Sequence, residues 1–120
     1  MTDPDFFPST IEEAVNHIVK NIEPEEVGYI KSQSSASVHF FGGMAMRNDW
    51  SLWEPDTPLK RDAIATYKIA HADDISGLIM DWVWAKVRGE EFDPVKACDI
   101  YHKHWAAYGM TSIEAGTPQS

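Results

Sequence analysis

The chain has 120 residues, 43% of them hydrophobic and 12% aromatic, which fits one folded domain with a single core rather than a disordered segment. Its formal net charge of −9 disfavours nucleic acid as a partner, because phosphate binding requires lysine and arginine. The apolar runs are too short for a membrane span, the N-terminus does not resemble a secretory signal, and the lone Cys98 cannot form an internal disulfide, so we expect a cytoplasmic protein.

The first predicted helix begins at Ser9, which forms a capping box with Glu12. Apolar residues follow at helical spacing up to Pro24, which marks the end of the helix: Ile11, Ala14, Val15, Ile18 and Ile22. A short helix is expected from Glu25 to Lys31, ahead of the polar loop SQSSAS.

The next helix is predicted over residues 36–48, with Gly42 and Gly43 in its interior. Each glycine costs roughly 1 kcal/mol relative to alanine, so a break at this pair is the competing interpretation. The segment WSLWEPDTP that follows is expected to be a loop anchored by Trp50 and Trp53.

Thr57 and Pro58 form an N-cap and first-turn pair for a helix that should run to about Ala70. Its predicted inner stripe consists of Leu59, Ala63, Tyr67 and Ala70, with Ile64 beside it. The basic pairs Lys60-Arg61 and Lys86-Arg88 are best explained as exposed helix faces.

The central helix is predicted to start with Asp73 as its N-cap and to end at Gly89. It is apolar over much of its surface, so it should lie in the middle of the domain; its apolar residues are Ile75, Leu78, Ile79, Met80, Trp82, Val83, Trp84 and Val87.

A last helix should run from Asp93-Pro94 to Gly109, with Cys98 as a small core residue. Its predicted stripe is Val95, Cys98, Tyr101, Trp105 and Tyr108. The expected fold is therefore a compact, all-α, single-domain bundle of five to six helices. Residues 1–8 would form an N-terminal arm, residues 9–109 the helical domain, and residues 110–120 a flexible tail.

Motifs for metal binding or catalysis are weak in this sequence. His102 and His104 are two residues apart and would point to opposite sides of a helix, and no His-Glu-x-x-His motif or cysteine pair is present. The sequence also lacks a Gly-x-Ser-x-Gly elbow and a phosphate-binding glycine loop. We therefore expect no metal site and no cofactor.

The most distinctive stretch is HFFGGMAMRNDWSLW, residues 39–53, considered together with HADDIS, residues 71–76. These two segments bring together a planar guanidinium, an amide, imidazoles, carboxylates and indole rings, which suit a planar, anionic small molecule. The candidate ligand-binding residues are His39, Arg47, Asn48, Trp50, Trp53, His71, Asp73 and Asp74. A structural alternative stays open, in which Arg47 pairs with Asp73 or Asp74 and the tryptophans fill the core.

The same residues resemble a known family. The first stretch is similar to the pattern HF-x-x-GM-x-x-RN-x-W-x-LW of DUF6794, a family of small bacterial and phage proteins, and residues 71–76 resemble its HPDD-x-S segment. The likeness covers roughly residues 10–105, with Ala72 where the family pattern has proline and with Gly42 beside Gly43. It implies a compact helical domain and no established activity.

Three functions remain open at this stage. The first is a non-enzymatic binding protein, of the kind that a phage or mobile element carries to bind or inhibit a host protein. The second is a protein that binds or sequesters a nucleotide-like anionic molecule through Arg47, Asn48 and the tryptophans. The third is a small hydrolase-like enzyme with His39 or His71 as general base beside Asp73. Self-association through an apolar patch is a further possibility.

Overall fold

The computed structural model describes residues 7–32, 50, 52, 54 and 56–116. These residues form an all-helical domain, which confirms the predicted fold class. The helix predicted over residues 36–48 lies outside the described residues. The elements are α1 (Ile11–Asn21), α2 (Pro24–Ser32), α4 (Pro58–Asp62), the π-helical turn η1 (Ala63–Tyr67), α5 (Ala72–Arg88), α6 (Pro94–Ala97), α7 (Asp99–Ala106) and α8 (Ser112–Ala115).

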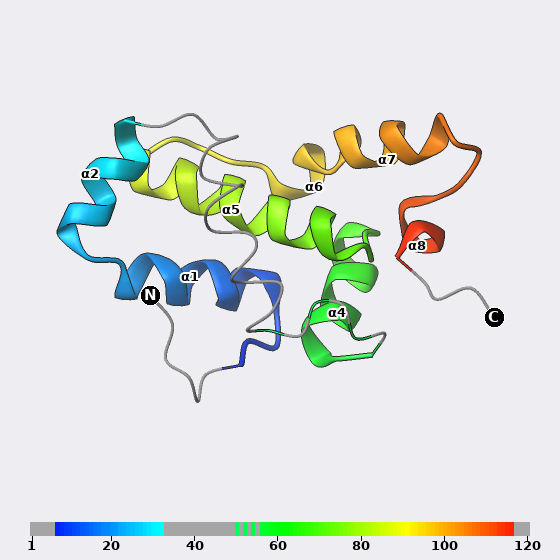
Figure 1. Cartoon of the computed structure of the whole chain (residues 1–120), viewed down its shortest axis with the longest axis horizontal. Coiled ribbons are helices and arrows are strands. Elements are labelled where there is room, and N and C mark those ends of the chain that lie inside the picture. The colour runs from blue at the N-terminus through cyan, green and yellow to red at the C-terminus, as the bar shows by residue number, and fades with distance from the viewer. Residues whose placement is uncertain (1–6, 33–49, 51, 53, 55, 117–120) are drawn as a thin grey trace.

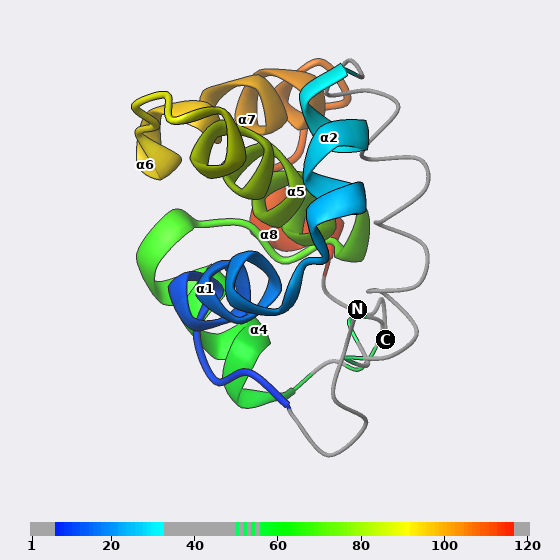
Figure 2. The same cartoon turned by 90° about the vertical axis from the view of Figure 1, so that its left-hand side faces the viewer.

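Helix α5 lies at the centre of the domain, as its apolar sequence predicts (Figure 1). Helices α1 and α2 pack against it, and α6 and α7 cover the side that faces away from α1 (Figure 2). The core includes the fully buried Ile75, Leu78, Ile79 and Val83 of α5. None of the helices in the described part of the chain is both long and apolar enough to cross a membrane.

Helix α1 buries the predicted face, but its N-cap is one residue later than expected. Thr10, not Ser9, accepts the capping bond, which the Glu13 amide donates over 3.0 Å. The backbone amide of Ile11, the first residue of α1, donates to a carboxylate oxygen of Asp62 at 2.8 Å. Because Asp62 ends α4, this bond satisfies an unpaired donor of α1 and joins two elements that are 51 residues apart.

The helix predicted from Pro58 to Ala70 is shorter and less regular than expected. Thr57 and Pro58 start it as predicted, with the Thr57 hydroxyl accepting from the Lys60 amide. The α-helix then widens into η1 and ends at Lys68, which adopts a left-handed backbone with φ 59°. The predicted inner residues Leu59, Ala63, Tyr67 and Ala70 are nevertheless all buried.

Lys60 is not on an exposed face, contrary to the prediction for the Lys60-Arg61 pair. Its side chain is 4% exposed, and its ammonium donates to the Leu52 carbonyl at 3.3 Å. Burial lowers the pKa of this lysine. Arg61, by contrast, is exposed and pairs with Asp56.

The last predicted helix is divided at Cys98 into α6 and α7, and α7 ends at Ala106 rather than at Gly109. Val95 and Tyr108 of the predicted inner stripe are exposed. Only the middle of that stripe faces the core, where Cys98 is fully buried and Tyr101 is half-buried.

Residues 111–116, within the segment expected to be a flexible tail, are folded. Thr111 and Glu114 form a capping box for α8, and Ser112 is buried. A β-carbon on Gly116 would lie 2.1 Å from the Ala70 carbonyl carbon, so the chain after α8 runs directly against the backbone that leads into α5. The C-terminal turn thus closes over the start of the central helix.

Candidate functional site

Four of the eight predicted ligand-binding residues, His39, Arg47, Asn48 and Trp53, lie outside the described residues. The structure therefore leaves both the Arg47-centred pocket and its structural alternative as predictions. The other four residues are described: Trp50 lies in the core, whereas His71, Asp73 and Asp74 lie together at the start of α5.

Trp50 lies in the hydrophobic core and is 1% exposed. Leu52, two residues later, is also fully buried. These positions fit the structural alternative, in which this stretch anchors the loop to the core.

His71, rather than the predicted Asp73, is the N-cap of α5. Its Nδ1 accepts a hydrogen bond of 3.1 Å from the Asp73 amide, and α5 begins at Ala72. His71 thus satisfies an unpaired amide in the first turn of α5.

Asp73 and Asp74 both lie in the first turn of α5, where carboxylates interact favourably with the helix dipole. Their environments differ sharply. The side chain of Asp73 is 62% exposed, whereas Asp74 is only 7% exposed. Asp74 is thus the member of the pair whose carboxylate lies inside the protein.

The partner of Asp74 is Trp105, whose indole N–H donates to a carboxylate oxygen at 2.8 Å. Burial raises the pKa of Asp74; the Trp105 hydrogen bond and the positive charge available to His71 oppose this rise without cancelling it. The ring of His71 lies 5.4 Å from that of Trp105, and the ring of His104 lies 4.8 Å from it in an edge-on arrangement. We call His71, Asp74, His104 and Trp105 the Trp105 cluster.

The sequence prediction included His71 and Asp74 but missed Trp105 and His104. The missing link is the Asp74–Trp105 bond, which joins residues 31 positions apart. No spacing rule connects them, because they meet only when α7 lies over the first turn of α5. The one available signal was the place of Trp105 in the inner stripe of the last helix.

Metal binding and thiol chemistry gain no support in the described part of the chain. No group of three or more metal-binding side chains occurs among these residues. Cys98 is fully buried and its thiol donates to the Pro94 carbonyl. Burial, with the nearby carboxylates of Asp74 and Asp99, raises the thiol pKa to about 12, so Cys98 is a core residue as predicted.

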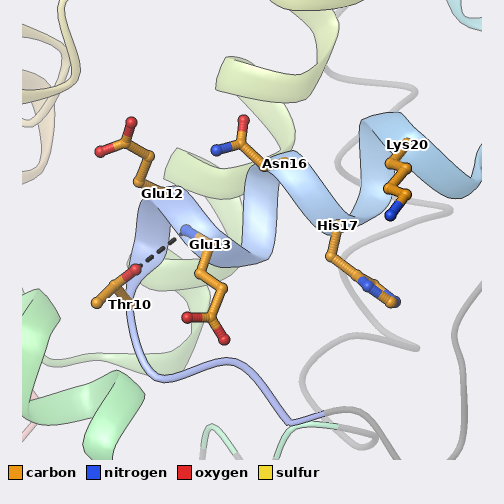
Figure 3. Close-up of a pocket in the computed structure, with 6 residues that line it drawn as sticks. All are labelled: Thr10, Glu12, Glu13, Asn16, His17 and Lys20. Atoms are coloured by element: carbon orange, nitrogen blue, oxygen red, sulfur yellow. Dashed lines mark hydrogen bonds between the residues drawn. The ribbon is translucent and has the colours of Figure 1, made fainter.

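A surface hollow of about 450 Å³ lies on α1 (Figure 3). All six of its described lining residues belong to α1 or to its N-cap: Thr10, Glu12, Glu13, Asn16, His17 and Lys20. Their side chains spread to different sides of the helix instead of converging, and Asn16 is engaged by the Lys86 ammonium at 2.7 Å. This hollow is best described as the outer face of α1.

The outer side of α7, unlike that of α1, carries large apolar side chains that are exposed to solvent. Ile100, Lys103, His104, Ala107 and Tyr108 recur at three- and four-residue steps along α7 and the turn after it, and all five are exposed. We call these residues the α7 face. Ile100 is 68% exposed and Tyr108 71% exposed, and the rings of His104 and Tyr108 lie 5.5 Å apart. The face combines apolar and basic groups and contains no carboxylate.

The architecture and this surface define a small, all-helical domain with a buried carboxylate–indole pair and an exposed apolar face. The chain belongs to the family described as Domain of unknown function (DUF6794), which it matches over residues 7–87. The match ends one residue before the end of α5, so α6, α7 and α8 lie beyond it. Neither the curated proteins nor the solved structures that were compared with the chain gave a match.

Proposed function

We propose that this protein is a non-enzymatic binding protein whose α7 face docks on an acidic, amphipathic segment of a host protein. The observation that carries the proposal is the exposure of Ile100 and Tyr108, two large apolar side chains whose burial against a partner would be favourable. Tyrosine is also among the residues that dominate the binding energy of protein interfaces.

The charge of the α7 face favours an acidic partner. The whole chain has a net charge of −9, yet the α7 face includes Lys103 and His104, and Asp99, one turn before Lys103, is the single acidic residue of α7. A basic surface on an acidic protein directs an acidic segment to this place and repels that segment elsewhere. Charge complementarity therefore also disfavours a second copy of this acidic chain as the partner.

The Trp105 cluster lies directly beneath the α7 face and connects it to α5. His104 lies on the α7 face, and the indole N–H of its neighbour Trp105 donates a hydrogen bond to Asp74 on the inner side. The indole–carboxylate bond ties α7 to the first turn of α5, which supports presentation of the outer side chains in a fixed position. Rigid presentation reduces the entropy that binding costs.

A photo-crosslinking amino acid at position 100, with the same group at exposed Lys20 of α1 as control, tests the proposal in bacterial lysate. The expected product is one host protein, crosslinked through an acidic segment and absent with the probe at position 20. With that purified partner, Ile100→Asp and Tyr108→Ala should each weaken binding at least tenfold, whereas Phe7→Ala, at an exposed phenylalanine ahead of α1, should not. Rising salt should slow association.

Three results would count against the proposal. They are a crosslink only to a second copy of this chain, a crosslink to a basic segment, and full affinity of the Ile100→Asp variant. The first would point to self-association instead.

A further inference from the structure

A second hollow, of about 420 Å³, is lined by residues of α7, of α8 and of the segments that follow η1 and α7. Figure 1 shows α8 below the C-terminal end of α7 and beside the start of α5. Its volume falls in the range of small-molecule sites, about 300–1,000 Å³. Unlike the hollow on α1, it is built by residues from three parts of the chain, including Lys68, His102 and Ile113.

The walls of this hollow are mainly apolar. Ala106, Met110 and Ile113 line it, and the latter two are half-buried. Such walls suit the apolar body of a ligand. The Thr111 hydroxyl, which also borders the hollow, is already used as the cap of α8.

The polar groups lie at two positions. The ammonium of Lys68 is exposed and donates a single described bond, to the Ala65 carbonyl at 3.0 Å. His102 is held by a 2.7 Å hydrogen bond between its Nδ1 and the hydroxyl of the buried Ser112. A fixed imidazole and a lysine on the rim of an apolar hollow together suit a carboxylate.

The backbone at Lys68 supplies an independent observation. Lys68 is the only residue other than glycine with a positive φ in the described part of the chain, and it follows directly on a π-helical turn. A left-handed conformation costs an L-residue roughly 1–2 kcal/mol, so helices that end in this way normally use glycine. Strained residues and π-turns both concentrate at functional sites. Lys68 therefore adopts a backbone conformation in which glycine would be less strained.

We propose that this hollow binds a small carboxylic acid with an apolar body, with the carboxylate at Lys68 and His102 and the apolar part against Met110 and Ile113. This site is separate from the α7 face, and the inference does not rest on docking to a partner protein. The class of ligand is that of a medium-chain fatty acid.

Isothermal titration with sodium octanoate, and with neutral octanamide as the matched control, tests the proposal. Octanoate should bind saturably at one site, and octanamide should bind at least tenfold more weakly because it cannot form the charge-assisted bond. Amide NMR shifts should move at residue 68 and across residues 102–113.

The decisive variant is Lys68→Gly, because glycine relieves the left-handed strain while removing the ammonium. We expect this variant to melt at a higher temperature than the wild type and yet to bind octanoate at least tenfold more weakly. Lys68→Arg, which keeps a cation at the rim, should bind within about threefold of the wild type. The proposal is overturned if octanoate does not bind saturably at millimolar concentration, if octanamide binds equally well, or if Lys68→Gly binds as the wild type does.

Discussion

The same substitution, glycine to alanine, should change stability in opposite directions at different positions of this chain. Gly116 follows α8 with φ −100°, a conformation open to any residue, so strain in its own backbone is not the reason for glycine. The reason is space, because an added β-carbon would lie 2.1 Å from the Ala70 carbonyl carbon and 2.2 Å from the His71 nitrogen. Both atoms are backbone and cannot rotate away.

The size of the effect follows from this geometry. Contacts of a β-carbon shorter than 3.0 Å essentially do not occur, so the chain after α8 and the start of α5 must separate by about 1 Å in Gly116→Ala. Overpacking of this kind costs about 1–3 kcal/mol. We expect a loss of about 2–3 kcal/mol in the free energy of unfolding, or a melting temperature lower by roughly 8–12 °C for a domain of this size.

Two other glycines provide matched controls. Gly28 lies inside α2, and a β-carbon added there would meet only open space, so Gly28→Ala should stabilise the protein by up to about 1 kcal/mol. Gly109 has φ +74° and also has open space, so Gly109→Ala should cost about 1 kcal/mol through strain alone. Urea unfolding monitored by tryptophan fluorescence measures all three, with a constant m-value as the check on comparability.

The geometric argument fails if Gly116→Ala is as stable as the wild type or as Gly28→Ala. It also fails if Gly116→Ala and Gly109→Ala lose the same stability and equally retain hydrogen-exchange protection in α8. In the expected case, α8 loses protection in Gly116→Ala only.

Three further predictions concern buried polar groups. Trp105→Phe keeps an aromatic ring but removes the donor to Asp74, so it should lower the free energy of unfolding by about 1–3 kcal/mol at pH 7. The loss should be smaller near pH 3, because the raised pKa of Asp74 leaves this carboxyl protonated there. An equal loss at both pH values would contradict the assigned bond. Cys98, whose pKa is raised to about 12, should react with a thiol reagent at pH 8 only after unfolding in urea, and rapid labelling of the folded protein would refute its burial. Because burial lowers the pKa of Lys60, the unfolded chain binds more protons than the folded protein at pH values between the lowered pKa and 10.5, so Lys60 should make stability rise with pH there. Lys60→Met should remove this rise and stabilise the protein at pH 7 by about 1 kcal/mol; thermal melts from pH 7 to 10 would show an unchanged slope if Lys60 were not the cause.

The sequence by itself determined the elements whose signals are local. The apolar spacing of α1 and α5, the Thr57-Pro58 and Asp93-Pro94 starts, and the left-handed Gly89 at the end of α5 depend on neighbouring residues only. Periodicity reports which face of a helix is buried, and caps report where its unpaired amides are satisfied. The all-α fold and the central place of α5 follow from these local rules.

The tertiary structure alone decided the contacts between distant segments. The Asp74–Trp105 bond, the burial of Lys60 and the approach of Gly116 to Ala70 each join residues that no sequence spacing relates. The ends of helices depend on tertiary packing too, which is why the helix after Pro58 widens into η1 and stops at Lys68, and why the last helix divides at Cys98. Local propensities differ by fractions of a kcal/mol, whereas burying one side chain contributes more than that, so packing decides wherever the two disagree.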